Sequence, residues 1–339
     1  MLHKISLVII WVLLSASVAY AQSIAPDPVQ YTVIPEQPGP GEQVTIEVDG
    51  VGQFLGNSTI TWQQDGKIIE AAGNSPTFRF TTGGVGSVTR IHLKIDSPTQ
   101  GLITHDFVFN PSVVNMIWEA DTYTPTLYKG KSLYTAGSPL KVVAYPTVYI
   151  NGSVVPTSKL SFQWRHNDTP DPSSSGLGKN IFLFVGDQLQ PEEDVSVTIY
   201  LGATIVAKGD MAIPASSPEV IFYPQDPLRG ELLGSGFQGT AQLTQTETTF
   251  KAEPYFFSAS AVRNSKLQYN WTLNDQETTG PDASRGVLTL RQTGSGAGAA
   301  DLGVSIQNTL SSQFIQAANA GLHLIFGQSG SAFSSFFGL

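Results

Sequence analysis

The feature that most constrains the fold is a strand-like segment that occurs three times around a tryptophan. The three copies are Thr59–Gly66 around Trp62, Leu160–Asn167 around Trp164, and Leu267–Asp275 around Trp271. Each copy alternates apolar and polar residues up to the tryptophan, which is the period-two pattern of a half-buried β-strand. Roughly one hundred residues separate successive tryptophans, which is the length of one immunoglobulin-like (Ig-like) sandwich. A buried tryptophan suits the centre of a sandwich without a disulfide, so we expect Trp62, Trp164 and Trp271 to be structural core residues.

The flanks of each tryptophan segment repeat as well. One alternating segment precedes it, two follow it, and a closing strand ends each unit. The dipeptides Asp65-Gly66 and Asn151-Gly152 accept positive φ angles and therefore favour tight hairpins. No helical pattern extends beyond a turn or two. The sequence therefore predicts an all-β chain of three tandem Ig-like (PKD-like) β-sandwiches.

Proline- and serine-rich breaks suggest the domain boundaries. Linkers are expected near Asn110–Ser112 and Pro214–Pro218, because proline there prevents a strand from continuing. Linkers this short favour a stiff rod of sandwiches. The predicted parts are a signal peptide (residues 1–21), three sandwiches (28–111, 113–214 and 218–326) and a flexible Phe-rich tail (327–339).

The amino-terminal residues have the features of an export signal. Lys4 precedes an apolar run, and Ala19-Tyr20-Ala21 is a small-residue cleavage site before Gln22. The apolar run is shorter than the ~20 residues that a membrane span needs. We therefore expect a cleaved signal peptide, a mature chain without a transmembrane helix, and a location in the cell envelope, on the cell surface or outside the cell.

Charge and cysteine content exclude several classes of function. The chain has 18 Lys and Arg against 27 Asp and Glu, a net charge of −9, whereas a nucleic-acid-binding surface needs a positive charge. With no cysteine, the chain has no disulfide, thiolate metal site or cysteine nucleophile.

The remaining chemical motifs are weak. The four histidines after the leader lack zinc-ligand spacing, and the G-x-S-x-G motif of α/β-hydrolases is absent. Gly234, Gly236 and Gly239 form a G-x-G-x-x-G motif, but a strand-like segment follows it, so we expect an ordinary loop. The acidic run Glu192-Glu193-Asp194 is interpreted as a solvated turn. We expect no catalytic residue, no cofactor and no metal.

Two groups of aromatic residues are candidates for binding a partner. The candidate partner-binding residues are Trp118, Tyr123, Tyr128, Phe333, Phe336 and Phe337. If the first three face outward, they could stack on sugar rings; alternatively, they pack where sandwiches meet. The phenylalanines of the tail either dock on a partner or pack back on the third sandwich.

Several motifs of the second and third units also resemble a known group of proteins. The opening segments Asp121–Gly130 and Tyr223–Gly230 are similar to each other and suggest a shared opening hairpin. Further matching motifs are Trp118–Lys131, Pro227-Leu228-x-Gly230 and Glu253–Ser258. Over residues 115–326, the chain resembles exported tandem Ig-like/PKD-like envelope proteins of small-genome, largely uncultured bacteria. That resemblance implies a secreted tandem-sandwich protein of unassigned activity, with no catalytic residue to transfer.

These features together predict a non-enzymatic, exported structural or adhesion scaffold with a protein or envelope component as partner. The alternative is an array of carbohydrate-binding modules that uses exposed aromatic side chains on a glycan. A glycosidase would require two carboxylates about 5–10 Å apart across a cleft, and no motif indicates one.

Overall fold

A computed structural model describes most of the chain. The described residues are 29–50, 55–150, 152–294, 296–310 and 316–327. They fold almost entirely as β-strands, with one short α-helix, α1 (Ala259–Arg263), and a few 3-10 turns. The predicted signal peptide and all of the tail beyond Gly327 lie outside the described residues.

The contact pattern divides the chain into two compact units. The first unit contains residues up to 33, 45–79 and 91–106, and the second contains 34–44, 80–90 and 107–339. The division runs through the first sandwich, whereas the second and third sandwiches both lie within the second unit.

The first sandwich is formed by seven strands. They are β1 (Val29–Ile34), β2 (Gln43–Gly50), β3 (Thr59–Gln64), β4 (Lys67–Ile68), β5 (Thr77–Thr81), β6 (Thr89–Ser97) and β7 (Gly101–Phe109). One sheet has the order β1-β2-β5 and the other β4-β3-β6-β7. The rings of Trp62 on β3 and Phe78 on β5 stack 5.0 Å apart and so connect the two sheets through the core.

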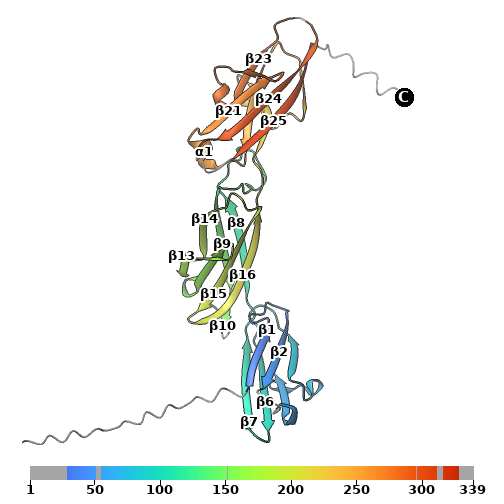
Figure 1. The fold of residues 1–339 in the computed structure, drawn as a ribbon, viewed down its shortest axis with the longest axis vertical. Coiled ribbons are helices and arrows are strands. Elements are labelled where there is room, and N and C mark those ends of the chain that lie inside the picture. Colours follow the sequence, from blue (N-terminus) through green and yellow to red (C-terminus); the bar gives the residue numbers. More distant parts are fainter. Residues whose placement is uncertain (1–28, 51–54, 151, 295, 311–315, 328–339) are drawn as a thin grey trace, which may run out of the picture. The chain divides into compact units, whose positions relative to one another are not determined.

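The second sandwich repeats this strand order (Figure 1). Its strands are β8 (Val113–Ala120), β9 (Pro139–Thr147), β10 (Tyr149–Ile150), β11 (Ser153–Val154), β12 (Ser161–His166), β13 (Thr169–Leu177), β14 (Ile181–Val185), β15 (Glu192–Leu201) and β16 (Thr204–Pro214). The two sheets have the orders β14-β9-β8 and β13-β12-β15-β16, and β10 and β11 form a separate hairpin.

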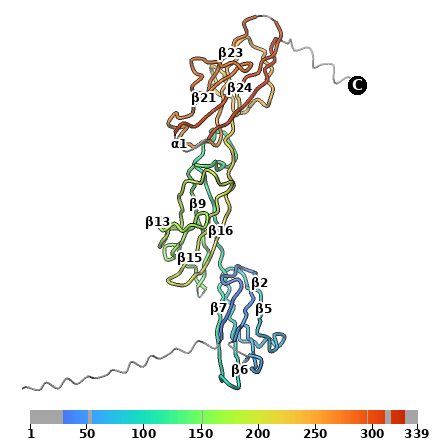
Figure 2. The backbone as a smooth tube through the Cα atoms, in the orientation of Figure 1, coloured from blue at the N-terminus to red at the C-terminus, as the bar shows by residue number. Residues whose placement is uncertain are grey.

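The third sandwich has the same arrangement with one strand added to each sheet, β18 and β19. Figure 2 traces its backbone. Its strands are β17 (Glu219–Asp226), β18 (Gly230–Glu231), β19 (Thr240–Leu243), β20 (Glu247–Tyr255), β21 (Leu267–Leu273), β22 (Gln276–Thr278), β23 (Val287–Arg291), β24 (Gly298–Asn308) and β25 (Ala317–Phe326). The sheet orders are β18-β17-β20-β23 and β19-β25-β24-β21-β22, with β19 parallel to β25. Three copies of one Ig-like strand order confirm the predicted all-β fold class.

The three repeated tryptophans occupy the same place in each sandwich. Trp62, Trp164 and Trp271 are buried. Each indole Nε1 donates a hydrogen bond to a backbone carbonyl that shortly precedes the sheet-edge strand, namely those of Ser75, Lys179 and Ala283. Tryptophan fits here because it fills the core and its single polar atom still finds an acceptor.

The turns after the tryptophan strands explain the Asp and Asn residues in the repeat. Asp65-Gly66, Asn167-Asp168 and Asn274-Asp275 all have positive φ angles and join the two strands of a hairpin. Two-residue hairpin loops of this kind need left-handed backbone, which Gly, Asn and Asp adopt at the lowest cost.

The shared opening hairpin is present in the third sandwich only. There, Gln225 pairs with Glu231 and Asp226 with Gly230. The corresponding prediction for Asp121–Gly130 is wrong: this segment forms an isolated bridge with Ser258 in place of a hairpin. The segment hydrogen-bonds to the third sandwich, and a proline within it cannot donate to a ladder.

Candidate functional site

The opening segment of the second sandwich, residues 121–135, is hydrogen-bonded to the third sandwich. The Tyr123 backbone N–H donates to the Phe257 carbonyl at 2.7 Å, and the Phe256 N–H donates to the Tyr123 carbonyl at 2.8 Å. The Ala259 N–H donates to the Asp121 carbonyl at 3.0 Å. This ladder lies within one compact unit, so the second and third sandwiches are joined by backbone pairing as well as by the linker.

Tyr123 also contributes its side chain to this junction. Its hydroxyl donates a hydrogen bond to Glu253 Oε1 at 2.5 Å, and Lys251 Nζ lies 3.8 Å from the other carboxylate oxygen. Burial raises the pKa of Glu253, and the Tyr123 and Lys251 contacts oppose that rise only in part. Burial, followed by the hydrogen bond from its own hydroxyl to Glu253, raises the pKa of Tyr123. The side chain is therefore held at the junction through its hydroxyl.

Tyr128 and Trp118 are engaged in a similar way. Tyr128 makes edge-on ring contacts with Tyr255 and Phe256, although part of its side chain is exposed. Trp118 lies on β8, packs against the core of the second sandwich, and has Lys131 Nζ 3.1 Å from its ring centroid. The other candidate partner-binding residues, Phe333, Phe336 and Phe337, lie outside the described residues.

A buried glutamine completes the junction. Gln316 Oε1 accepts a hydrogen bond from the Ser258 N–H, and its Nε2 donates to Ser138 Oγ, both at 2.9 Å. Thr135 Oγ1 donates to the Phe256 carbonyl at 2.7 Å. Gln316 has no signal in the sequence, because a single glutamine next to a predicted strand forms no pattern.

The interpretation of Glu192-Glu193-Asp194 as a solvated turn is wrong for Glu193. These residues begin strand β15, and Glu193 is fully buried. Its carboxylate pairs with three side chains and one backbone amide: Tyr134 Oη at 2.6 Å, His166 Nε2 at 2.6 Å, Asn167 Nδ2 at 3.0 Å and Asp187 N at 2.5 Å. Burying a carboxylate away from water costs several kcal/mol of free energy unless hydrogen-bond donors surround it, as they do here.

This cluster fills one end of the second sandwich. We call the end at which the last strand of a sandwich finishes its exit pole, and at the second sandwich that strand is β16. Tyr134 is completely buried there, and a Cβ added at Gly186 would collide with its hydroxyl. Burial and the hydrogen bond to Glu193 raise the pKa of Tyr134. The exit pole of the second sandwich is thus closed by a tightly packed polar cluster.

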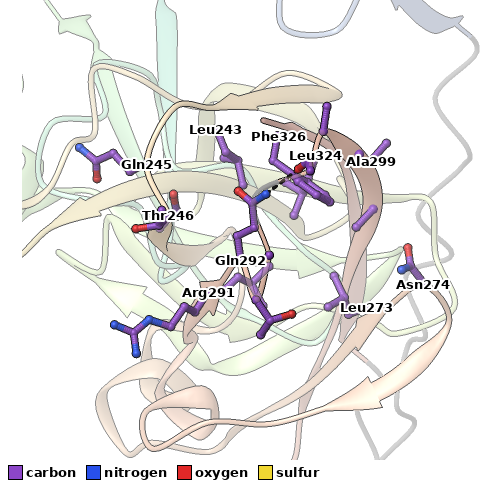
Figure 3. A pocket seen from close by; sticks show the side chains of 18 residues that line it. Leu243, Gln245, Thr246, Leu273, Asn274, Arg291, Gln292, Ala299, Leu324 and Phe326 are labelled. Carbon is purple, nitrogen blue, oxygen red and sulfur yellow. Dashed lines mark hydrogen bonds between the residues drawn. The ribbon is translucent and has the colours of Figure 1, made fainter. Parts of the chain in front are cut away.

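The exit pole of the third sandwich is open (Figure 3). It holds a cavity of about 460 Å³. The apolar side chains of its wall are Leu243, Leu273, Leu290, Leu324 and Phe326. The Gln292 side chain hydrogen-bonds to the Gly296 carbonyl at 2.7 Å and holds a glycine-rich loop at its edge.

Matching hydrogen bonds identify the equivalent residues of the two exit poles. In the second sandwich, the Asn167 N–H donates to the Asp194 carbonyl, and the Asp194 N–H donates to Asn167 Oδ1. Asn274 and Asp301 make the same reciprocal pair in the third. Ala300 precedes Asp301 as Glu193 precedes Asp194, so Ala300 occupies the position of Glu193. In the same way, Leu273 precedes Asn274 and occupies the position of His166.

The second sandwich also exposes apolar side chains on the outer face of its three-stranded sheet. Five large side chains there are exposed: Ile117 on β8, Tyr145 on β9, and Ile181, Leu183 and Val185 on β14. Cross-strand pairing puts Ile117, Val143 and Ile181 in one row. We call these five residues the outer apolar face. Leu183, at 64% exposure, stands out furthest among those of β14.

The corresponding edge strands of the other sandwiches lack this property. The outward positions equivalent to Ile181, Leu183 and Val185 are Thr77, Arg79 and Thr81 on β5, and Val287, Thr289 and Arg291 on β23. An apolar outward surface is therefore specific to the second sandwich among these three equivalent strands.

Two further histidines form ion pairs at the surface. His92 pairs with Asp106 at 2.6 Å and His323 with Asp301 at 2.7 Å, both at exposed positions. Across the described ranges, no group of three or more His, Asp or Glu side chains is placed to share a metal ion. The G-x-G-x-x-G motif lies in a loop before β19, as predicted. None of the described helices has the length and apolar character that crossing a bilayer requires.

Comparisons with known proteins find similarity to solved structures at low TM-scores. No family model and no curated protein matches it. Three N-terminal domains of the bacteriophage RB49 outer capsid protein Hoc are 9% identical, with 89% of this chain and 99% of that chain covered and a TM-score of 0.26. A Bacteroides ovatus protein, SGBP-B, solved with a mixed-linkage heptasaccharide, is 9% identical, with 89% and 71% covered and a TM-score of 0.22. The insect immune protein hemolin is 11% identical, with 88% and 77% covered and a TM-score of 0.23. No functional conclusion follows from similarities this low.

Proposed function

We propose that the protein is a non-enzymatic, exported scaffold or adhesion protein that binds a protein partner through the outer apolar face of its second sandwich. The observation that carries the proposal is the exposure of Ile117, Tyr145, Ile181, Leu183 and Val185 on one sheet face. Large apolar side chains gathered on one exposed face are costly in water and commonly mark a binding site, and here the ion pair of Glu119 and Lys141 lies beside Leu183 among them. The predicted export signal puts this surface where envelope and surface proteins are available as partners.

The position of β14 adds a second element of recognition. β14 is the terminal strand of the order β14-β9-β8, so within the described sheet only one of its edges is paired. An unpaired edge presents backbone N–H and C=O groups to which an extended partner segment can add as a strand. Backbone pairing at this edge and apolar contacts on the adjoining face suit a protein partner.

The carbohydrate-binding alternative is less well supported. Stacking on a sugar needs an aromatic ring with a free, flat face. Tyr123 is hydrogen-bonded to Glu253, Tyr128 contacts two aromatic rings, and Trp118 packs on the core under Lys131. These rings stabilise the junction between the sandwiches, so replacing one with alanine should lower the melting temperature.

Polar substitution of the outer apolar face tests the proposal. We expect Ile181→Gln combined with Leu183→Gln to reduce at least tenfold the amount of the mature chain that producing cells retain. Losing about 1.4 kcal/mol of binding free energy suffices for that change, and burying either side chain contributes that much. Glutamine is neutral, so the substitution removes apolar surface without changing the charge.

Thr289→Gln, at the equivalent outward position of the third sandwich, is the matched control. Both proteins should melt like the native chain, because all three side chains are exposed. Undiminished retention of the double variant would contradict the proposal. So would glycan binding that Tyr128→Ala abolishes at an unchanged melting temperature, or turnover of a polysaccharide or peptide substrate by the mature chain.

A further inference from the structure

The cavity at the exit pole of the third sandwich opens directly onto its hydrophobic core. Leu243, Leu273 and Leu290 line the cavity and pack against the buried core, yet each is only half-buried. Part of each leucine side chain remains in water, so covering it would be favourable in free energy. At the equivalent position, the second sandwich buries the Glu193 carboxylate among the side chains that donate to it, so the fold itself does not require leucines to be half-buried here.

The cavity has the size and chemistry of an aromatic-binding site. A buried apolar cavity of about 150 Å³ holds one benzene ring, so about 460 Å³ accommodates more than one phenylalanine side chain. Its apolar wall is surrounded by polar groups of Gln245, Asn274 and Gln292, which can hydrogen-bond to the backbone of an incoming segment.

The chain itself supplies such a segment at the edge of the cavity. Phe326 lines the cavity, and the next residue, Gly327, has a φ of +72°. A Cβ at Gly327 would collide with the Gly296 carbonyl, so only glycine fits there. The residues that follow are rich in glycine and serine up to Ala332 and then contain Phe333, Phe336 and Phe337. Six residues from Gly327 to Phe333 span at most about 20 Å.

We propose that the Phe-rich segment, residues 328–339, folds back on the same chain and places phenylalanine rings in this cavity. Glycine and serine make the connection flexible enough to reverse direction. A segment attached at the cavity edge has an effective concentration in the millimolar range, which exceeds that of the same segment on another chain in dilute solution. Burying the rings and covering the leucines both remove apolar surface from water.

The second sandwich shows the same chain path in a completed form. Directly after β16, the Ser216 N–H donates to the Tyr134 carbonyl at 2.7 Å, so the chain that leaves the last strand contacts the exit pole before it enters β17. Thr135 and Ser216 form a parallel bridge. In the third sandwich, β19 and β25 provide the equivalent parallel pair, and the Phe-rich segment is the chain that follows it.

Disulfide trapping tests this proposal. The native chain has no cysteine, so only the two introduced cysteines can form a disulfide. One full-length variant carries Gln245→Cys at the cavity edge together with Ser335→Cys. The matched variant carries Thr289→Cys, on the outer face of β23, together with Ser335→Cys. Both partner sites are exposed and belong to the third sandwich. We expect the intrachain disulfide to form at least tenfold faster at position 245.

Replacing Phe333, Phe336 and Phe337 with serine should abolish that tenfold advantage, because the flexible connection remains while the anchoring rings are gone. Equal rates at positions 245 and 289 would overturn the proposal, as expected if a partner holds the segment. So would an advantage that persists without the phenylalanines, or disulfides that form between chains. None of these outcomes depends on the outer apolar face, so the two proposals can fail separately.

Discussion

The second and third sandwiches share one strand order but expose apolar surface in opposite places. The second has an exit pole built around a buried carboxylate, and it exposes apolar side chains on its outer sheet face. The third has an apolar, open exit pole, and the equivalent edge strand carries threonine and arginine outward. A repeated fold therefore fixes where the strands lie, whereas a few side chains decide which surface is left available for binding.

Two pairs of equivalent residues account for the difference at the poles. Glu193 and His166 in the second sandwich correspond to Ala300 and Leu273 in the third. The buried glutamate requires hydrogen-bond donors, and Tyr134 and Asn167 are among the residues that supply them. Alanine and leucine require none, so the same region can remain hollow.

Removing the buried carboxylate should have the largest effect. We expect Glu193→Ala to lower the free energy of unfolding of the second sandwich by about 3–5 kcal/mol, because buried donors of Tyr134, His166 and the Asp187 amide lose their acceptor. Thermal or denaturant unfolding of the full chain measures this. Asp194→Ala, one residue further on and exposed, is the control. Similar stability of the two variants would show that the cluster does not hold the pole together.

Placing a carboxylate in the third pole should have an intermediate effect. Ala300→Glu puts a charge beside Leu273 without donors, and we expect a loss of about 1–2 kcal/mol. Adding Leu273→His recreates the pair that the second sandwich uses and should recover part of that loss. If Leu273→His lowers the stability of the Ala300→Glu variant further, positions 300 and 273 are not equivalent to Glu193 and His166.

The smallest effect concerns Glu253, whose pKa is raised by burial from its ordinary value near 4.5. A raised pKa means that the folded state favours the protonated acid. The stability due to this group is therefore complete below its ordinary pKa and declines as the pH rises through the raised value.

Glu253→Gln keeps an acceptor for Tyr123 but no longer titrates. Melting temperatures measured from below pH 4.5 upward should shift in favour of the variant as the pH rises, because only the native chain has a buried acid that must lose its proton. A difference between variant and native chain that does not depend on pH would show that Glu253 is not strained by burial.

Local patterns predicted most of the fold. Strand positions, the buried tryptophans and the turns at Asp65-Gly66, Asn167-Asp168 and Asn274-Asp275 follow from alternation and from residues that accept left-handed backbone. Contacts between distant segments were not predictable in this way. Tyr123 meets Glu253 because of how the opening segment docks, and no spacing along the chain indicates that contact.

Two features could have been found in the sequence. Glu193 alternates with Val195, Val197 and Ile199, which puts it on the buried face of β15. The outer apolar face has a signal in Ile181–Val185, where every residue is apolar, so that β14 presents apolar side chains on both faces. The acidic triplet is misinterpreted when its composition is considered without its alternation with the apolar residues that follow it in β15.

Amide hydrogen exchange of the mature chain tests the proposed interaction face most directly. The exchange is measured for the free protein and for the protein rebound to envelope fractions from producing cells. We predict that binding slows exchange in β14 and the neighbouring part of β9, while β23 of the third sandwich exchanges at the same rate in both states. Slower exchange confined to the exit pole of the third sandwich or to the Tyr123–Glu253 junction, with β14 unchanged, would contradict the account.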